Sequence, residues 1–103
     1  MSKHFQKETK KIQKKVWGNK KDKDFNTTDV PLEFCLLEGE VTEAFESWRE
    51  NNDGLGEELA DIAIYLFGLS QMVGIDLGKE IIEKMNKNKD REYKKINGVS
   101  KKV

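Results

Sequence analysis

One stretch decides the fold: residues 56–73, GEELADIAIYLFGLSQMV. Apolar residues fall on nearly every side of its helical wheel, which is typical of a central helix, so we expect a helix over residues 57–73. Glu58 and Asp61 interrupt this pattern, because they share a sector of the wheel with Tyr65 that would otherwise be core. The helix dipole explains acids in the first turn, but it leaves Asp61 unexplained. We therefore interpret Glu58 and Asp61 as metal ligands; Tyr65 either reaches the same site or is a buried tyrosine with a local partner.

A second acidic pair, Glu40 and Glu43, lies upstream with the same three-residue spacing. Residues three apart share one face of a helix, so each pair puts two carboxylates side by side. If the two helices pack together, four carboxylates converge, and two such charges about 5 Å apart repel by roughly 3 kcal/mol at an effective dielectric of about 20. A cation must therefore sit there. Oxygen ligands alone point to Mg²⁺ or Mn²⁺, and Mg²⁺ in enzymes usually accompanies a substrate that carries phosphate.

The helix that carries this second pair is predicted over residues 31–50. Capping residues precede Pro31, and proline is tolerated only in the first turn of a helix, so the helix begins there. An apolar arc is expected to be buried beside the two acids; it consists of Phe34, Leu37, Val41, Ala44, Phe45 and Trp48.

The ends of the chain are basic and enclose an acidic middle. Residues 1–23 hold nine lysines against two acids, whereas residues 24–61 hold twelve acids against one arginine. Residues 1–26 are predicted to form a basic N-terminal helix, over 4–17, and a loop. This distribution suits a site that binds a metal in one part and phosphates in another.

A fourth helix is predicted over residues 77–96, after the capping residue Asp76. One edge of it carries a polar and cationic stripe, made of Lys84, Asn88, Arg91 and Lys95. Such a stripe is either a solvated face or, beside a carboxylate and metal cluster, a set of triphosphate ligands. The tail, residues 97–103, carries no pattern and is expected to be frayed.

A length of 103 residues indicates one domain, residues 1–103. At this size folding buries only about 60 to 65% of the surface of the unfolded chain, and an oligomer would close the deficit. Lysine plus arginine equal aspartate plus glutamate at 19 each, so the net charge predicts no nucleic-acid partner. No apolar run approaches the roughly 20 residues of a membrane span, and no signal peptide is recognisable, which predicts a cytoplasmic protein without a membrane partner.

Other catalytic classes lack their residues. The single histidine, His4, excludes histidine-rich metal sites and argues against a Ser-His-Asp triad. Gly78-Lys79 is followed by Glu80 rather than by Ser or Thr, which excludes a P-loop. Cys35 is alone and has apolar neighbours, so we expect a buried structural thiol and no disulfide.

Taken together, these motifs resemble the MazG-like family of all-α nucleoside triphosphate pyrophosphohydrolases. The resemblance covers roughly residues 27–97. It rests on four segments in this order: LEGEVTEA (37–44), GEELADIAIYL (56–66), GIDL (74–77), and EKMNKN (83–88) followed by Arg91 and Tyr93.

The resemblance implies an all-α, four-helix bundle completed by oligomerisation, as a homodimer or homotetramer whose sites are completed between subunits. It implies Mg²⁺-dependent hydrolysis of a nucleoside or deoxynucleoside triphosphate to the monophosphate and pyrophosphate, with Mn²⁺ as the alternative ion, in housecleaning of the nucleotide pool. The family's ExxE and ExxD motifs fall on the expected metal ligands, Glu40, Glu43, Glu58 and Asp61. Its phosphate or nucleotide contacts fall on Lys84, Asn88, Arg91 and Tyr93, and we add Tyr65 to the expected substrate contacts.

The expected mechanism uses one or two metal ions held by the four carboxylates. Water attacks the α-phosphorus, Glu40 or Glu43 takes its proton, and the metal, Lys84 and Arg91 stabilise the departing pyrophosphate. Trp17 and Trp48 are interpreted as core residues, with stacking on the base as the alternative. A different hypothesis is a helical oligomer with weak or no catalysis that binds nucleotides or another protein. Metal-dependent turnover separates the two hypotheses.

Overall fold

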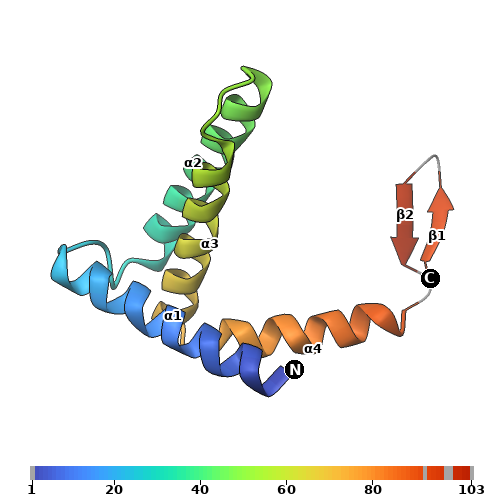
Figure 1. Ribbon diagram of the computed structural model, residues 1–103, viewed down its shortest axis with the longest axis horizontal. Helices are drawn as coiled ribbons and strands as arrows, with labels where there is room; N and C mark the ends of the chain where they lie inside the picture. Colours follow the sequence, from blue (N-terminus) through green and yellow to red (C-terminus); the bar gives the residue numbers. More distant parts are fainter. Residues whose placement is uncertain (1, 92, 97–98, 103) are drawn as a thin grey trace.

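Four helices and a short hairpin make up the computed structural model, which describes residues 2–91, 93–96 and 99–102. The helices are α1 (Ser2–Asp22), α2 (Val30–Arg49), α3 (Leu55–Met72) and α4 (Leu77–Lys89). Strands β1 (Tyr93–Ile96) and β2 (Val99–Lys102) pair antiparallel, with Tyr93 opposite Lys102 and Ile96 opposite Val99. The predicted all-α class with four helices is confirmed, and the hairpin is a small addition beyond the end of α4 (Figure 1).

Side-chain caps fix the starts of α2 and α4, as the sequence predicts. Asp29 Oδ1 accepts a hydrogen bond from the Leu32 amide at 3.0 Å, and Pro31 lies in the first turn that follows. Asp76 Oδ1 accepts one from the Lys79 amide at 3.3 Å. Each cap satisfies an amide that the helix itself leaves unpaired, so the two helices begin close to their predicted positions.

The first helix is longer than predicted. α1 continues to Asp22, although residues 18–26 were expected to form a loop. Lys20 forms a buried ion pair with Glu33, and this tertiary contact outweighs the low helix propensity of Gly18. The extra turn carries Lys20 against α2 and α3, which matters for the site below.

The fourth helix is shorter than predicted. α4 ends at Lys89 rather than near residue 96, and the residues beyond it form the hairpin. The tail over residues 97–103 was expected to be frayed, but β2 occupies residues 99–102. Aromatic and β-branched residues favour strands, and the sequence Asn97-Gly98 between them is typical of a hairpin, a signal that outweighs the helical pattern.

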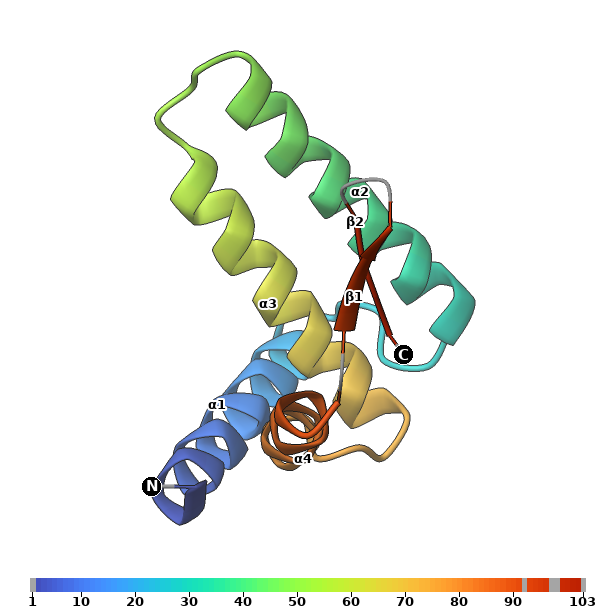
Figure 2. The same ribbon diagram turned by 90° about the vertical axis from the view of Figure 1, so that its right-hand side faces the viewer.

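The helices form two pairs that cross at one end of the molecule. α2 and α3 lie side by side as a long antiparallel pair, and α1 lies beside α4 across the C-terminal end of α3 (Figures 1 and 2). α3 contacts each of the other three helices, so the central position that its apolar sequence predicts is confirmed. α4 packs against α1 and α3 but not against α2.

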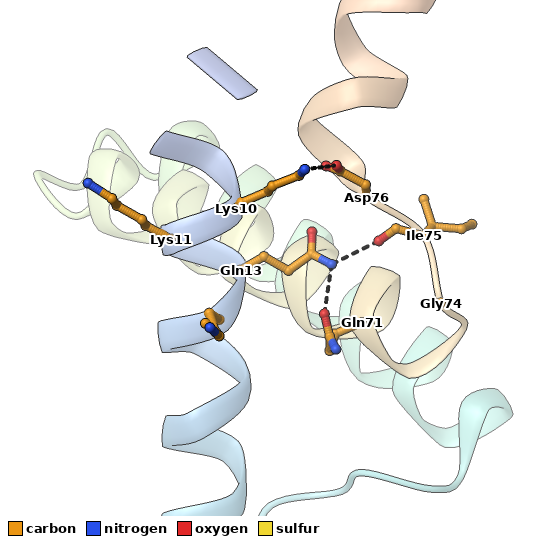
Figure 3. Close-up of a pocket in the computed structure, with 8 residues that line it drawn as sticks. Lys10, Lys11, Gln13, Gln71, Gly74, Ile75 and Asp76 are labelled. Carbon is orange, nitrogen blue, oxygen red and sulfur yellow. Dashed lines mark hydrogen bonds and ion pairs between the residues drawn. The ribbon is translucent and has the colours of Figure 1, made fainter. Parts of the chain in front are cut away.

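Gln13 of α1 ties the two pairs together (Figure 3). Its Nε2 donates hydrogen bonds to Gln71 Oε1 at 3.0 Å and to the Ile75 carbonyl at 2.8 Å, and its Oε1 accepts one from the Leu77 amide at 3.3 Å. Gly74, in this turn, has a φ of 74°, a conformation that glycine adopts without strain. The buried amide therefore fixes α1 against the turn between α3 and α4.

Most apolar side chains are not buried within one chain. Among the described residues, only Ala44 and Leu69 are buried hydrophobic residues, and the apolar arc of α2 is otherwise largely exposed, with Trp48 63% and Phe45 54% accessible. The prediction that Trp48 is a core residue is therefore wrong for the single chain, and Cys35 is likewise exposed rather than buried. Of the arc, Ala44 is buried, whereas Phe34, Val41, Phe45 and Trp48 remain exposed in one chain. The radius of gyration of 16.3 Å agrees with such an open shape, since a compact chain of this length has about 13 Å.

In the described part of the chain, no single helix is long and apolar enough to cross a membrane; only α3 and α4 taken together, across a bend of 106°, reach that length and composition.

Candidate metal centre

Three carboxylates converge where α2 packs against α3. Glu40 and Glu43 occupy successive turns of α2, and Glu58 lies in the first turn of α3. One carboxylate oxygen from each residue lies within 4.8 Å of the other two. Asp61, one turn further along α3, lies outside this three-residue group, although its charge acts on two of the members.

The cluster holds its negative charge at an electrostatic cost. Burial raises the pKa of the Glu40 carboxyl above its usual range, and the charges of Glu43, Asp61 and Glu58 raise it further. Burial is also the largest cause that raises the pKa of Glu58, followed by the charges of Glu43 and Asp61. Like charges and desolvation both disfavour the ionised forms, and a cation at this point would offset the repulsion.

Two oxygen atoms of the cluster lack a partner. Glu40 Oε2 and Glu58 Oε2 are both buried, and neither accepts a hydrogen bond from the described residues. Buried acceptors are nearly always satisfied in proteins, so these two atoms point to a ligand. Carboxylate oxygens without nitrogen or sulfur suit a hard cation such as Mg²⁺ or Mn²⁺. The residues present therefore fit a divalent cation.

A cavity of about 350 Å³ adjoins the cluster, between the end of α1, the start of α2 and the middle of α3. Asp61 and Tyr65 line it, so the structure brings the predicted substrate contact Tyr65 beside the acidic residues. Burial, followed by the charges of Glu40 and Glu33, raises the pKa of the Tyr65 hydroxyl above its ordinary value of 10.0. The hydroxyl therefore stays protonated at neutral pH and can donate a hydrogen bond.

A buried ion pair forms the innermost part of this cavity. Lys20 Nζ lies 2.6 Å from Glu33 Oε2, and the Glu33 side chain is fully buried. Asn26 Nδ2 donates to the other oxygen, Glu33 Oε1, at 3.2 Å. The Lys20 ammonium also lies 5.8 Å from the centre of the Tyr65 ring, within the range of a cation–π contact. The pair thus joins α1, α2 and α3 at one point.

The comparison with protein families bears on the segment that contains this site. A family model, described as the MazG-like family, matches residues 32–103, which is more than half of the chain and includes all four predicted metal ligands. The chain belongs to the MazG-like family. No curated protein and no solved structure matches this MazG-like chain.

The phosphate contacts predicted for the MazG-like chain lie on α4, apart from the acidic cluster. Lys84 and Asn88 are exposed on a helix that does not pack against α2, and Arg91 Nη1 donates to Asn88 Oδ1 at 3.5 Å. Tyr93 falls in β1, and its side chain lies outside the described residues. Within the described part of one chain, these residues are therefore not brought to the carboxylates.

A second cavity, of about 510 Å³, lies between α1 and the turn that joins α3 to α4 (Figure 3). Lys10, Lys11 and Lys14 line it together with Asp76, whose carboxylate lies 3.7 Å from Lys10 Nζ. No residue of the acidic cluster lines this cavity. The MazG-like chain therefore has a basic cavity that is separate from the candidate metal centre.

The buried pair was missed by the sequence analysis. Lys20 belongs to a segment with many lysines, and nothing in the sequence distinguishes it from its exposed neighbour Lys21. Glu33 lies in the first turn of α2, where an acid is expected because it complements the helix dipole. Only the packing of α1 against α3, which brings Lys20 to Glu33 at the start of α2, gives these two residues a special position.

Proposed function

We propose that the protein is a divalent-metal-dependent pyrophosphohydrolase of nucleoside or deoxynucleoside triphosphates, with housecleaning of the cytoplasmic nucleotide pool as its role. The observation that carries the proposal is the convergence of Glu40, Glu43 and Glu58, whose oxygens lie within 4.8 Å of one another. The two buried oxygens without partners support a cation there. Membership of the MazG-like family supports the class of reaction.

These three residues would hold the cation, with Asp61 beside them as the fourth predicted ligand. When bound, Mg²⁺ or Mn²⁺ supplies positive charge to the triphosphate oxygens and lowers the pKa of a water molecule at the site. The carboxylates carry the same charge as the triphosphate, so their role would be to hold the cation, and Asp61 lies on the side on which the neighbouring cavity begins.

The reaction is hydrolysis at the α-phosphorus. The water oxygen bonds to that phosphorus while the bond to the oxygen that bridges to the β-phosphorus breaks, so the products are the nucleoside monophosphate and pyrophosphate. A carboxylate takes the water proton. Glu40 or Glu43 takes this role, since both carboxylates lie at the cluster.

A second subunit completes the proposed site. The exposed apolar arc of α2 gives a surface that another copy can cover, and a homodimer or homotetramer would bury it. Because α4 of one chain does not pack against α2, the α4 that brings Lys84, Asn88 and Arg91 to the triphosphate is that of a neighbouring subunit. These three residues, and Tyr93 beyond them, would then bind phosphate groups or nucleotide.

Pyrophosphate release tests the proposal. The protein is assayed with a panel of canonical and damaged nucleoside and deoxynucleoside triphosphates, in Mg²⁺, in Mn²⁺ and with a chelator. We expect release from at least one triphosphate, dependent on metal and abolished by the chelator. The substrate that is cleaved fastest then names the class of nucleotide.

Absence of release across the whole panel, from a folded protein, would contradict the proposal. It would favour the alternative function, a helical module that binds nucleotides or a protein partner without turnover. Binding of the same nucleotides, measured by calorimetry, then distinguishes a nucleotide-binding module from a protein-interaction module.

A further inference from the structure

We propose that the cavity beside the acidic cluster holds the nucleobase, and that Lys20 selects bases with a carbonyl oxygen at the edge furthest from the sugar. Uracil, thymine, guanine and hypoxanthine carry such an oxygen, whereas cytosine and adenine carry an amino group at that position. The inference rests on the proposed function and names its class of substrate.

The position of Asp61 places the base. Asp61 lines the cavity, and its charge acts on Glu40 and Glu58, so the cavity begins where the triphosphate would be held. The sugar must lie on this side, because it is joined to the α-phosphate. The base then extends away from the carboxylates and into the cavity.

The ion pair lies at the inner end of this path. Lys20 and Glu33 have side chains that are only 10% and 0% accessible, so they are the most buried of the residues that line the cavity. Apolar side chains form much of the remaining lining; they are Val16, Phe25, Leu36 and Ile64. A base that enters from the metal side therefore meets Lys20 with the edge opposite its sugar.

Lys20 is the charged donor that remains available to a ligand. Within the described residues its ammonium donates one hydrogen bond, to Glu33, although an ammonium has three N–H groups. Both Glu33 oxygens are already engaged, one by Lys20 and one by Asn26. The Asn26 amide is also occupied, since its oxygen accepts from the Asp29 amide at 2.9 Å. The ammonium therefore offers two further N–H groups at the inner wall, where it is the charged donor, beside Glu33 oxygens that can each accept one more hydrogen bond.

This donor set discriminates between bases. An ammonium hydrogen bonds to a carbonyl oxygen, but an amino group presents its own N–H atoms and leaves the donor unpaired. A hydrogen bond from a charged donor in a buried site changes affinity by about tenfold or more. The cavity is thus expected to prefer the carbonyl member of any pair of bases of equal size.

The backbone leaves room for the lysine. A Cβ atom at Gly68 of α3 would lie 3.0 Å from Lys20 Cδ and 3.7 Å from Glu33 Oε2. Buried ion pairs add little net stability compared with apolar residues of the same volume, so stability alone does not explain a lysine at this place. In the proposal, the lysine is there because its remaining N–H groups select a ligand group.

Two matched pairs of nucleotides test the inference. Pyrophosphate release is compared between dUTP and dCTP and between dITP and dATP, and calorimetry without metal compares the corresponding monophosphates. We expect the carbonyl member of a pair to have a kcat/KM, and an affinity as monophosphate, about tenfold or more above the amino member. Equal values, or a preference for the amino member, would overturn the inference while the hydrolase function stands.

The double variant Lys20→Met with Glu33→Gln removes the ammonium without leaving an unpaired carboxylate. The carbonyl preference should fall below about threefold, whereas the variant Lys21→Met, at an exposed lysine beside it, should keep the wild-type preference. A preference that survives in the folded double variant would overturn the role of Lys20. If the double variant does not fold, the wild-type comparison alone decides.

The two proposals fail in different ways. A carbonyl preference in monophosphate binding without any pyrophosphate release would sustain the base pocket and contradict the hydrolase. Pyrophosphate release without a carbonyl preference would sustain the hydrolase and contradict the base pocket.

Discussion

Single residues of the acidic cluster are expected to destabilise the metal-free protein, because burial and like charges disfavour their ionised forms. At neutral pH the Glu58 carboxylate is partly desolvated and repelled by Glu43 and Asp61. We predict that Glu58→Gln raises the melting temperature of the metal-free protein at pH 7 and abolishes the increase that Mg²⁺ gives the wild type. Differential scanning fluorimetry with a chelator and with Mg²⁺ measures both effects. The control Glu57→Gln changes a neighbouring exposed acid outside the cluster and should keep the Mg²⁺ response.

The sign of the pH dependence follows from the raised pKa. A carboxyl whose pKa is higher in the folded state favours folding below its ordinary value of 4.5, and this contribution is lost as the pH rises through the folded pKa. The stability gained by Glu58→Gln should therefore be larger at pH 7 than at pH 4.5 in the chelator. A gain that shrinks with rising pH would contradict the electrostatic account of the cluster.

The buried ion pair makes a second prediction at this scale. Glu33→Gln leaves the Lys20 ammonium buried without its counter-ion, and loss of one partner of a buried pair costs about 3 to 5 kcal/mol. Lys20→Met combined with Glu33→Gln should recover much of that loss. Urea unfolding of the two single variants and the double variant measures the coupling; additive effects would contradict it.

The sequence could predict part of the site and not the rest. Acids that interrupt an apolar helix are conspicuous, so Glu40, Glu43 and Glu58 could be identified before their convergence was seen. Lys20 and Glu33 are ordinary charged residues in sequence, because their burial depends on how α1 packs against α3 and brings Lys20 to Glu33. A charged residue that is buried only through tertiary packing does not alter the helical pattern of the sequence.

At the scale of elements, two helical glycines have opposite roles. Gly39 lies in the middle of α2, where an added Cβ would meet no atom within 4 Å. We predict that Gly39→Ala stabilises the protein by about 0.5 to 1 kcal/mol, because alanine loses less backbone entropy in a helix. The urea midpoint measures this change. A loss of stability would mean that a neighbouring subunit packs closely against this face.

Gly78, at the start of α4, provides the contrast. A Cβ there would lie 2.6 Å from Thr9 Cβ of α1, so Gly78→Ala should cost about 1 to 3 kcal/mol by forcing the two helices apart. Thr9→Gly in the same chain, which removes that Cβ, should restore part of the loss. A neutral Gly78→Ala would contradict the close packing of α1 on α4.

Secondary structure was predictable wherever a cap or a strong period marks the chain. Asp29 and Asp76 start α2 and α4 in sequence and in the structure. The helical pattern beyond Lys89 was misleading, because lysines and asparagine fit either a helix or the polar side of a hairpin. The choice there depends on the pairing of β1 with β2, which involves residues of two separate segments.

At the scale of the whole molecule, the exposed apolar surface predicts association. Phe34, Val41 and Phe45 of α2 are each about half accessible, at 50%, 49% and 54%. We expect a homodimer or homotetramer in light scattering at micromolar concentration. Phe45→Glu places a charge on this arc and should shift the association equilibrium towards the monomer. A monomer that is stable at high concentration would contradict the proposed assembly.

Subunit mixing tests whether the site is shared. Glu58→Gln removes a carboxylate of α3, and Arg91→Ala removes a cation that follows α4, so each variant should be inactive alone. Mixing the two under subunit exchange should restore part of the pyrophosphate release, because some sites then combine wild-type residues from different subunits. A mixture as inactive as its components would place both residues in one subunit's site.

Metal-dependent pyrophosphate release by matched variants of one helix tests the central claim most directly. Glu43 belongs to the acidic cluster, whereas Glu46, on the next turn of α2, pairs with Arg49 at the surface. With the best substrate and Mg²⁺, Glu43→Gln should lower kcat/KM by about a hundredfold or more, and Glu46→Gln should stay within about twofold of the wild type. Equal activity of the two variants, or release that persists in the chelator, would contradict a catalytic metal centre at this cluster.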